Sequence, residues 1–137
     1  MEYLTTGKLA KASGVKLETV RFYERQGLLP KPARTSAGYR CFSPVAVQRI
    51  QFIKRAQVLG FTLTEIKELL ALSSAAGVSC GTVRESANAK IKDIEDRIRS
   101  LQSMRRALGR LARTCSGEGP ISKCPILESL AHPKEEP

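Results

Sequence analysis

The stretch TVRFYERQGLL, residues 19–29, decides how the first part of the chain folds. It forms most of a helix that we predict over residues 17–26. This helix should end at Gly27, because glycine readily takes the left-handed conformation that closes a helix. Residues 6–12 predict a shorter helix, and the serine and glycine at 13–14 predict a turn between the two. The sequence therefore predicts a helix, a tight turn and a second helix.

The two predicted helices divide their residues between a packed face and a free face. The apolar residues that can pack the helices together are Leu9, Ala10, Val15, Val20 and Leu28. The polar or amphipathic positions left free on and beside the second helix are Lys16, Thr19, Arg21 and Tyr23. Such a helix fits the major groove of DNA, where arginine reads guanine and other side chains hold phosphates. A plain helical hairpin is the alternative interpretation.

A small hairpin, or wing, is predicted next. The stretch PKPARTSAGYRCFSP, residues 30–44, contains prolines and a glycine around a short extended segment. It carries Arg34, Tyr39 and Arg40, and a basic, aromatic loop beside a recognition helix suits contact with DNA phosphates. We interpret Cys41, which stands alone in this wing, as a small apolar residue.

A second helix pair follows the wing, over residues 44–59 and 62–72. Ser43 and Pro44 predict an N-cap followed by proline at the first helical position, and Thr62 with Glu65 predicts a capping box. Its apolar residues, which we interpret as core, are Val45, Val47, Ile50, Ile53, Leu59, Phe61, Leu63, Ile66, Leu69 and Leu70.

Residues 82–112 predict one long amphipathic helix that no proline interrupts. Its apolar positions recur in steps of three or four, at Val83, Ala87, Ile91, Ile94, Ile98, Leu101, Met104, Leu108 and Leu111. Because a single helix cannot bury such a stripe by itself, we expect a homodimer held by a coiled coil. The alternative is that the helix folds back onto the first half of its own chain.

The charge of the chain indicates its partner and its compartment. The formal net charge is +10, and residues 1–75 hold 12 Lys and Arg against 5 Asp and Glu. This excess in the predicted helix-turn-helix half suits double-stranded DNA. No apolar run is long enough for a membrane span or resembles a signal peptide, so we expect a cytoplasmic protein with reduced thiols and no membrane partner. No Cys-His, Ser-His or carboxylate constellation indicates an enzyme.

Three of the four cysteines flank the long helix. Cys80 precedes it and Cys115 follows it, roughly 50 Å away at about 1.5 Å per residue, so the two cannot meet within one protomer. If two copies pair antiparallel, Cys80 of one approaches Cys115 and Cys124 of the other. Three thiolates favour a soft ion, and mercury(II) or lead(II) fits best. A thiol-redox regulator that pairs Cys115 with Cys124 in a disulfide is a rival hypothesis.

These patterns predict an all-α fold with a small β wing. We expect a winged helix-turn-helix domain with its second helix pair over residues 1–75 and an antiparallel dimerisation helix over 79–113. A metal-binding loop and a short C-terminal helix should occupy residues 114–131. The remaining residues, 132–137, read as a disordered tail.

Residues 4–40 and 47–70, with the run TVRFYERQGLL at their centre, closely resemble the DNA-binding half of the MerR family of bacterial transcriptional regulators. The resemblance implies a homodimer on a palindromic promoter. It also implies that metal binding distorts the promoter DNA so that RNA polymerase can engage both promoter elements. One departure is Cys41-Phe42, where many members carry a small or basic residue and then tyrosine; it puts one wing phosphate contact in question.

The resemblance extends to the cysteines. Cys80, Cys115 and Cys124 match the three cysteines of mercury- and lead-responsive members, and CPILESL, residues 124–130, is most similar to the mercuric regulators. Copper(I) sensors usually carry serine at the position of Cys80, and zinc and cadmium sensors tend to add histidine or cysteine ligands, whereas His132 is the only histidine here. The resemblance therefore ranks mercury(II) first, lead(II) second and cadmium(II) third.

Overall fold

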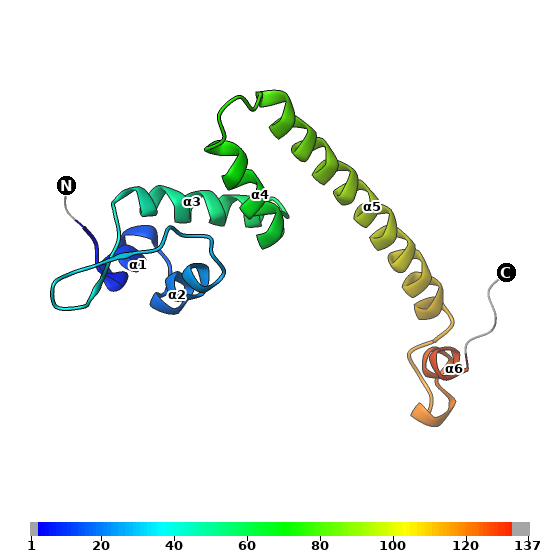
Figure 1. Cartoon of the computed structure of the whole chain (residues 1–137). Helices are drawn as coiled ribbons and strands as arrows, with labels where there is room; N and C mark the ends of the chain where they lie inside the picture. The colour runs from blue at the N-terminus through cyan, green and yellow to red at the C-terminus, as the bar shows by residue number, and fades with distance from the viewer. Residues whose placement is uncertain (1–2, 133–137) are drawn as a thin grey trace. The chain divides into compact units, whose positions relative to one another are not determined.

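The structure is a computed structural model that describes residues 3–132. It is mostly helical and has one small two-stranded antiparallel sheet, as the sequence predicts. In chain order (Figure 1) the elements are α1 (Thr6–Ser13), α2 (Leu17–Arg25), β1 (Ala33–Arg34), β2 (Arg40–Cys41), α3 (Val45–Val58), α4 (Leu63–Ser73), α5 (Cys80–Arg113), the 3-10 turn η1 (Ile121–Lys123) and α6 (Pro125–Ala131). The chain forms two compact units, Met1–Lys90 and Ile91–Pro137.

Local capping explains the first helix pair. The Thr5 hydroxyl accepts a hydrogen bond from the backbone N–H of Lys8, at 3.2 Å, and so caps the start of α1. Gly14 ends α1 with φ of 70°, and its N–H bonds back to the carbonyls of Ala10 and Lys11. The predicted helix, tight turn and helix are confirmed.

The predicted wing is an antiparallel hairpin. Ala33 pairs with Cys41 and Arg34 pairs with Arg40, and the chain turns through Gly38 at φ of 87°. A bridge between Leu4 and Phe42 joins this hairpin to the start of the chain. Phe42 is buried and anchors the base of the wing in the core.

The core of the first unit lies between α1, α2, α3 and α4. Its buried apolar residues are Leu9, Ala10, Val20, Tyr23, Leu28, Leu29, Phe42, Ala46, Ile50, Ile53, Ala56, Ile66 and Leu70. The predicted capping box of α4 is present, with Thr62 and Glu65 each bonding the other's backbone N–H. The core prediction is wrong for two residues. Val45 begins α3 and Leu59 follows its end, and both side chains are mostly exposed.

The long helix α5 extends the predicted span slightly at both ends. Within the second unit its apolar stripe is exposed, at Ile91, Ile94, Ile98, Leu101, Met104 and Leu108. The described helices include none that is long and apolar enough to cross a membrane. Of the predicted disordered tail, residues 133–137 lie outside the described residues, while His132 follows α6 with its Nε2 3.8 Å from Glu128 Oε1.

Candidate functional site

The free face of α2 presents two of the predicted DNA-contacting residues to solvent. Lys16 precedes the helix as its N-cap and Arg21 lies within it, and both are exposed. Thr19 is half-buried. An exposed guanidinium on the second helix of a helix-turn-helix can donate a bidentate pair of hydrogen bonds to a guanine edge or a phosphate.

Tyr23 differs from its expected free position, because the structure buries it. Its side chain is 4% exposed, and its hydroxyl donates a hydrogen bond of 2.9 Å to Gln57 Oε1 on α3. Burial raises the pKa of this phenol above its ordinary value, so the group stays protonated as a donor. Tyr23 therefore joins α2 to α3 and does not belong to the exposed surface of α2.

The two arginines of the wing already make contacts within the chain. Arg34 Nη1 donates a hydrogen bond of 2.9 Å to the carbonyl of Gly38, which holds this side chain across the hairpin turn. Arg40 Nε lies 3.3 Å from Glu24 Oε1 on α2, so an ion pair ties the wing to the recognition helix. Tyr39, by contrast, is 70% exposed at the tip. The wing thus carries one exposed aromatic ring and two guanidinium groups that are fixed by contacts within the chain.

Two of the three predicted metal ligands line one pocket. Cys115 lies just beyond the end of α5 and Cys124 lies directly before α6, and both line a pocket of about 290 Å³ formed by the loop between them. The backbone N–H of Gly117 donates a hydrogen bond of 3.3 Å to Cys115 Sγ. This hydrogen bond holds the sulfur within the loop that forms the pocket.

Cys80 lies elsewhere on the chain. It is exposed and is the first residue of the 34-residue helix α5, whereas the loop that carries the other two thiols follows the end of that helix. Within the described part of one chain, no three Cys, His, Asp or Glu side chains are grouped closely enough to hold a metal ion. Cys41 is engaged in the wing, where its Sγ donates to the carbonyl of Ala33 at 3.3 Å.

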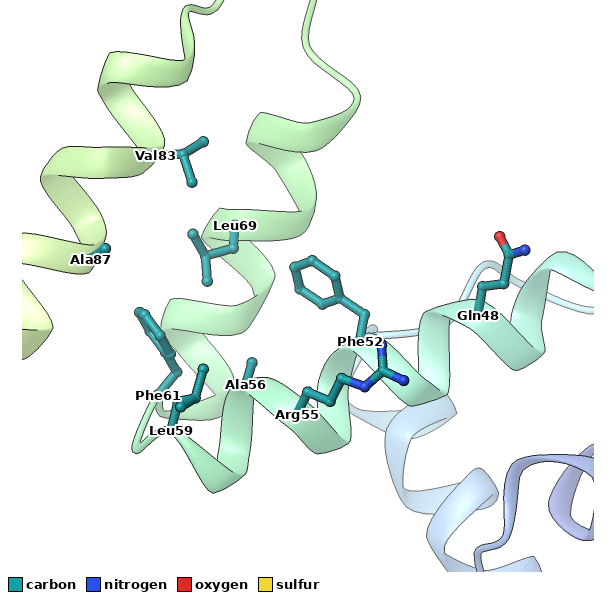
Figure 2. A pocket seen from close by; sticks show the side chains of 9 residues that line it. All are labelled: Gln48, Phe52, Arg55, Ala56, Leu59, Phe61, Leu69, Val83 and Ala87. Atoms are coloured by element: carbon teal, nitrogen blue, oxygen red, sulfur yellow. The ribbon is translucent and has the colours of Figure 1, made fainter.

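An apolar pocket that the sequence did not reveal lies where α3, α4 and the start of α5 meet (Figure 2). Its volume is about 460 Å³, and its lining residues are Gln48, Phe52, Arg55, Ala56, Leu59, Phe61, Leu69, Val83 and Ala87. The sequence signal nearest to it is the pair Leu59 and Phe61 at the turn before α4, since both line the pocket and Leu59 is mostly exposed.

Two family models cover most of the chain. The model for the MerR HTH family regulatory protein matches residues 4–73, and the model described as "MerR, DNA binding" matches residues 47–111. The chain belongs to the MerR family. Members of this family are DNA-binding transcription regulators, so the winged helix-turn-helix of this MerR protein is a DNA-binding domain.

Relatives of this MerR-family chain include proteins named for metals. It is 44% identical to the mercuric resistance operon regulatory protein of Bacillus cereus, over 90% of this chain and 94% of that protein. It is 39% identical to the protein of the same name from Serratia marcescens, over 98% and 92%. The solved structure of the transcription regulator PbrR691 from Ralstonia metallidurans, in complex with lead(II), matches with 36% identity and a TM-score of 0.84, over 93% of this chain and 98% of that one.

Proposed function

We propose that this MerR-family protein is a mercury(II)-responsive regulator of heavy-metal resistance genes. It binds promoter DNA as a homodimer, and mercury(II) binds Cys80 of one protomer together with Cys115 and Cys124 of the other. The bound ion changes the distortion of the promoter, which lets RNA polymerase start transcription. The observation that carries this proposal is the placement of the thiols, two in one pocket after α5 and one at the first residue of the same helix.

The donor chemistry of these residues fits a soft ion. The three thiols match the preference of mercury(II) for sulfur, and the loop pocket holds no histidine that would favour zinc. The exposed stripe on α5 supports the dimer that the shared site requires, because an antiparallel partner would cover the stripe and bring its own Cys115 and Cys124 to Cys80. The similarity to the mercuric regulators favours mercury(II).

Lead(II) is the second candidate, and it is favoured by the similarity to the lead-bound regulator structure. The deciding experiment titrates the reduced protein with mercury(II) and, separately, with lead(II), in millimolar competing thiol. The readouts are the ultraviolet sulfur-to-metal charge-transfer absorption and the number of ions bound per dimer. We expect a tight mercury complex that is lost in Cys80→Ser and kept in the control Cys41→Ser. Stronger binding of lead(II) would change the ion, and a signal indifferent to Cys80 would overturn the shared site.

The remaining candidates are separated by their inducers. A cadmium(II) sensor would respond to cadmium at lower concentrations than to mercury. A thiol-redox regulator would activate on treatment with diamide or peroxide without any metal, through a disulfide between Cys115 and Cys124. For the metal sensor we expect transcription to rise with added mercury(II) while thiols are kept reduced, and no response to diamide.

DNA recognition is tested separately from metal binding. Arg21→Ala should weaken binding to the promoter, since it removes an exposed guanidinium from α2, and should leave the mercury titration unchanged. Fluorescence anisotropy with a labelled promoter fragment measures the first effect. Unchanged promoter affinity in this variant would remove Arg21 from the DNA-contacting surface.

A further inference from the structure

The ion pair between Glu24 and Arg40 joins the recognition helix to the wing. Glu24 lies in the last turn of α2, Arg40 is the first residue of β2, and Glu24 Oε1 lies 3.3 Å from Arg40 Nε. The side chain of Glu24 is 20% exposed and that of Arg40 is 40% exposed. Arg40 Nε itself is enclosed, so this exposure belongs to the other atoms of the side chain. The carboxylate is therefore more enclosed than the arginine that it meets.

A carboxylate is an unexpected group beside the predicted DNA-contacting residues. Glu24 follows Arg21 by three positions, so the two are neighbours on one side of α2. DNA phosphates repel a carboxylate, so a glutamate at this place weakens DNA binding unless it contributes in another way. If Glu24 has no other role, removing its charge should strengthen binding.

The wing depends on the rest of the chain for its direction, because a two-stranded hairpin is only marginally stable by itself. At its base, the backbone N–H groups of Leu4 and Phe42 each donate a hydrogen bond of 2.7 Å to the other's carbonyl. Further along, Arg34 and Arg40 are directly opposite each other, where like charges destabilise a strand pair. Glu24 offsets this repulsion at Arg40 and ties the strand to α2.

The ion pair between Lys90 and Glu65 has a different setting in the same unit. It joins α5 to α4 at 2.8 Å, and Lys90 is buried. The hydrogen bond from Lys90, followed by that from the Thr62 N–H, lowers the pKa of Glu65 to about 2, so this pair acts on stability. The pair between Glu24 and Arg40 is partly exposed, and such pairs contribute little to stability. Its effect is therefore expected on the position of the wing.

We propose that Glu24 is a positioning residue that holds Arg40 beside α2, so that the wing and the recognition helix meet the DNA backbone as one surface. This inference rests on the proposed contact between Arg40 and DNA. Because Glu24 meets the Nε, the two Nη groups at the end of the guanidinium can donate a bidentate pair of hydrogen bonds to one phosphate. Ordering a long side chain at an interface weakens binding, and the ion pair orders Arg40 before DNA arrives.

Removing the charge of Glu24 tests the proposal, because repulsion alone and positioning predict opposite signs. Glu24→Gln should weaken binding to a labelled promoter fragment about fivefold, although it takes a negative charge away from the DNA. The matched control Glu18→Gln removes an exposed carboxylate of the same helix and should bind as tightly as the wild type or more tightly. Fluorescence anisotropy without metal measures both. Equal or tighter binding by Glu24→Gln, or the same loss in Glu18→Gln, would overturn the proposal.

A double-mutant cycle shows whether Glu24 acts through Arg40. Arg40→Ala should weaken binding and lower the slope of log affinity against log salt by about 0.9, the value for one phosphate contact. In this background Glu24→Gln should cause no further loss. A further loss as large as that in the wild type would show that Glu24 does not act through Arg40. Unchanged affinity in Arg40→Ala would refute both the wing contact and the role of Glu24.

Two measurements on the free protein separate positioning from folding. NMR relaxation of the Arg40 Nε–H group should show a restrained side chain in the wild type and a mobile one in Glu24→Gln. Urea unfolding should give about the same free energy for both proteins. Equal mobility, or lower stability with unchanged DNA affinity, would indicate a purely structural ion pair and refute the proposal. Because no metal is added, a failure to bind mercury(II) would overturn the proposed metal response and leave this test intact.

Discussion

Tyr23 and Tyr39 are the same residue type in two unlike environments. Tyr23 is enclosed by the core and donates to Gln57, whereas Tyr39 is 70% exposed at the tip of the wing. Both lie in stretches that the sequence links to DNA. The hydrogen-bond partner of Tyr23 is 34 positions away in the chain, so no local pattern around residues 19–29 could reveal it.

Replacing each tyrosine by phenylalanine should separate these environments. Tyr23→Phe removes one hydrogen bond and leaves Gln57 without that partner, so the free energy of unfolding should fall by about 1 kcal/mol. Tyr39→Phe should leave it unchanged, because the lost hydroxyl is exposed to water. Urea unfolding followed by circular dichroism measures both. Equal losses in the two variants would contradict the packing of Tyr23.

Glu65 gives stability a dependence on pH. Its folded-state pKa of about 2 lies below the ordinary value of 4.5, so its contribution to stability is complete above about pH 4.5 and is lost as the pH falls toward 2. The difference in unfolding free energy between the wild type and Glu65→Gln should therefore shrink through this range. Urea unfolding at several pH values tests it, and a difference that does not vary with pH would contradict the depressed pKa.

At the scale of elements, the proposed dimer depends on the exposed stripe of α5. Ile98 is 48% exposed on this stripe. Ile98→Lys would place a charge in the expected helix pair, so the dimer should dissociate at least about tenfold more readily. Ser100→Lys adds the same side chain on the opposite side of the helix and serves as the control. Sedimentation equilibrium measures both, and equal dissociation constants would show that the stripe does not form the interface.

Elements could be predicted where the signal is local. The capping box at Thr62, the glycine at position 14 and the unbroken spacing along α5 each depend on residues a few positions apart. The missed features depend on distant partners. Lys90 lies in a charged stretch that reads as a solvated face, and its side chain is buried beside Glu65 of α4 and the Phe61 ring, both distant in the sequence. The loop pocket brings together Cys115 and Cys124, which lie close in the sequence, whereas a complete three-thiol site would need a second chain.

At the scale of the whole molecule, the proposed sharing of the metal site between two chains is best tested with a mixture of two variants. Cys80→Ser homodimers and Cys115→Ser/Cys124→Ser homodimers should each bind mercury(II) weakly, because neither contains a complete site. Subunit exchange between them should restore one tight site in each mixed dimer, since one chain then supplies Cys80 and the other supplies the remaining pair. The charge-transfer absorption before and after mixing measures this. Absence of recovery, with exchange verified by mass spectrometry, would exclude a site shared between protomers.

The apolar face of α5 also has a consequence for folding thermodynamics. Residues 91–108 leave their large side chains in water in the single chain, so covering them by a partner adds stability that depends on the amount of protein present. The melting temperature should then rise with concentration. A cell that makes fewer copies of the protein would therefore lower the fraction of chains that are paired as well as their concentration. The lifetime of a newly made chain would depend on how soon it pairs with another.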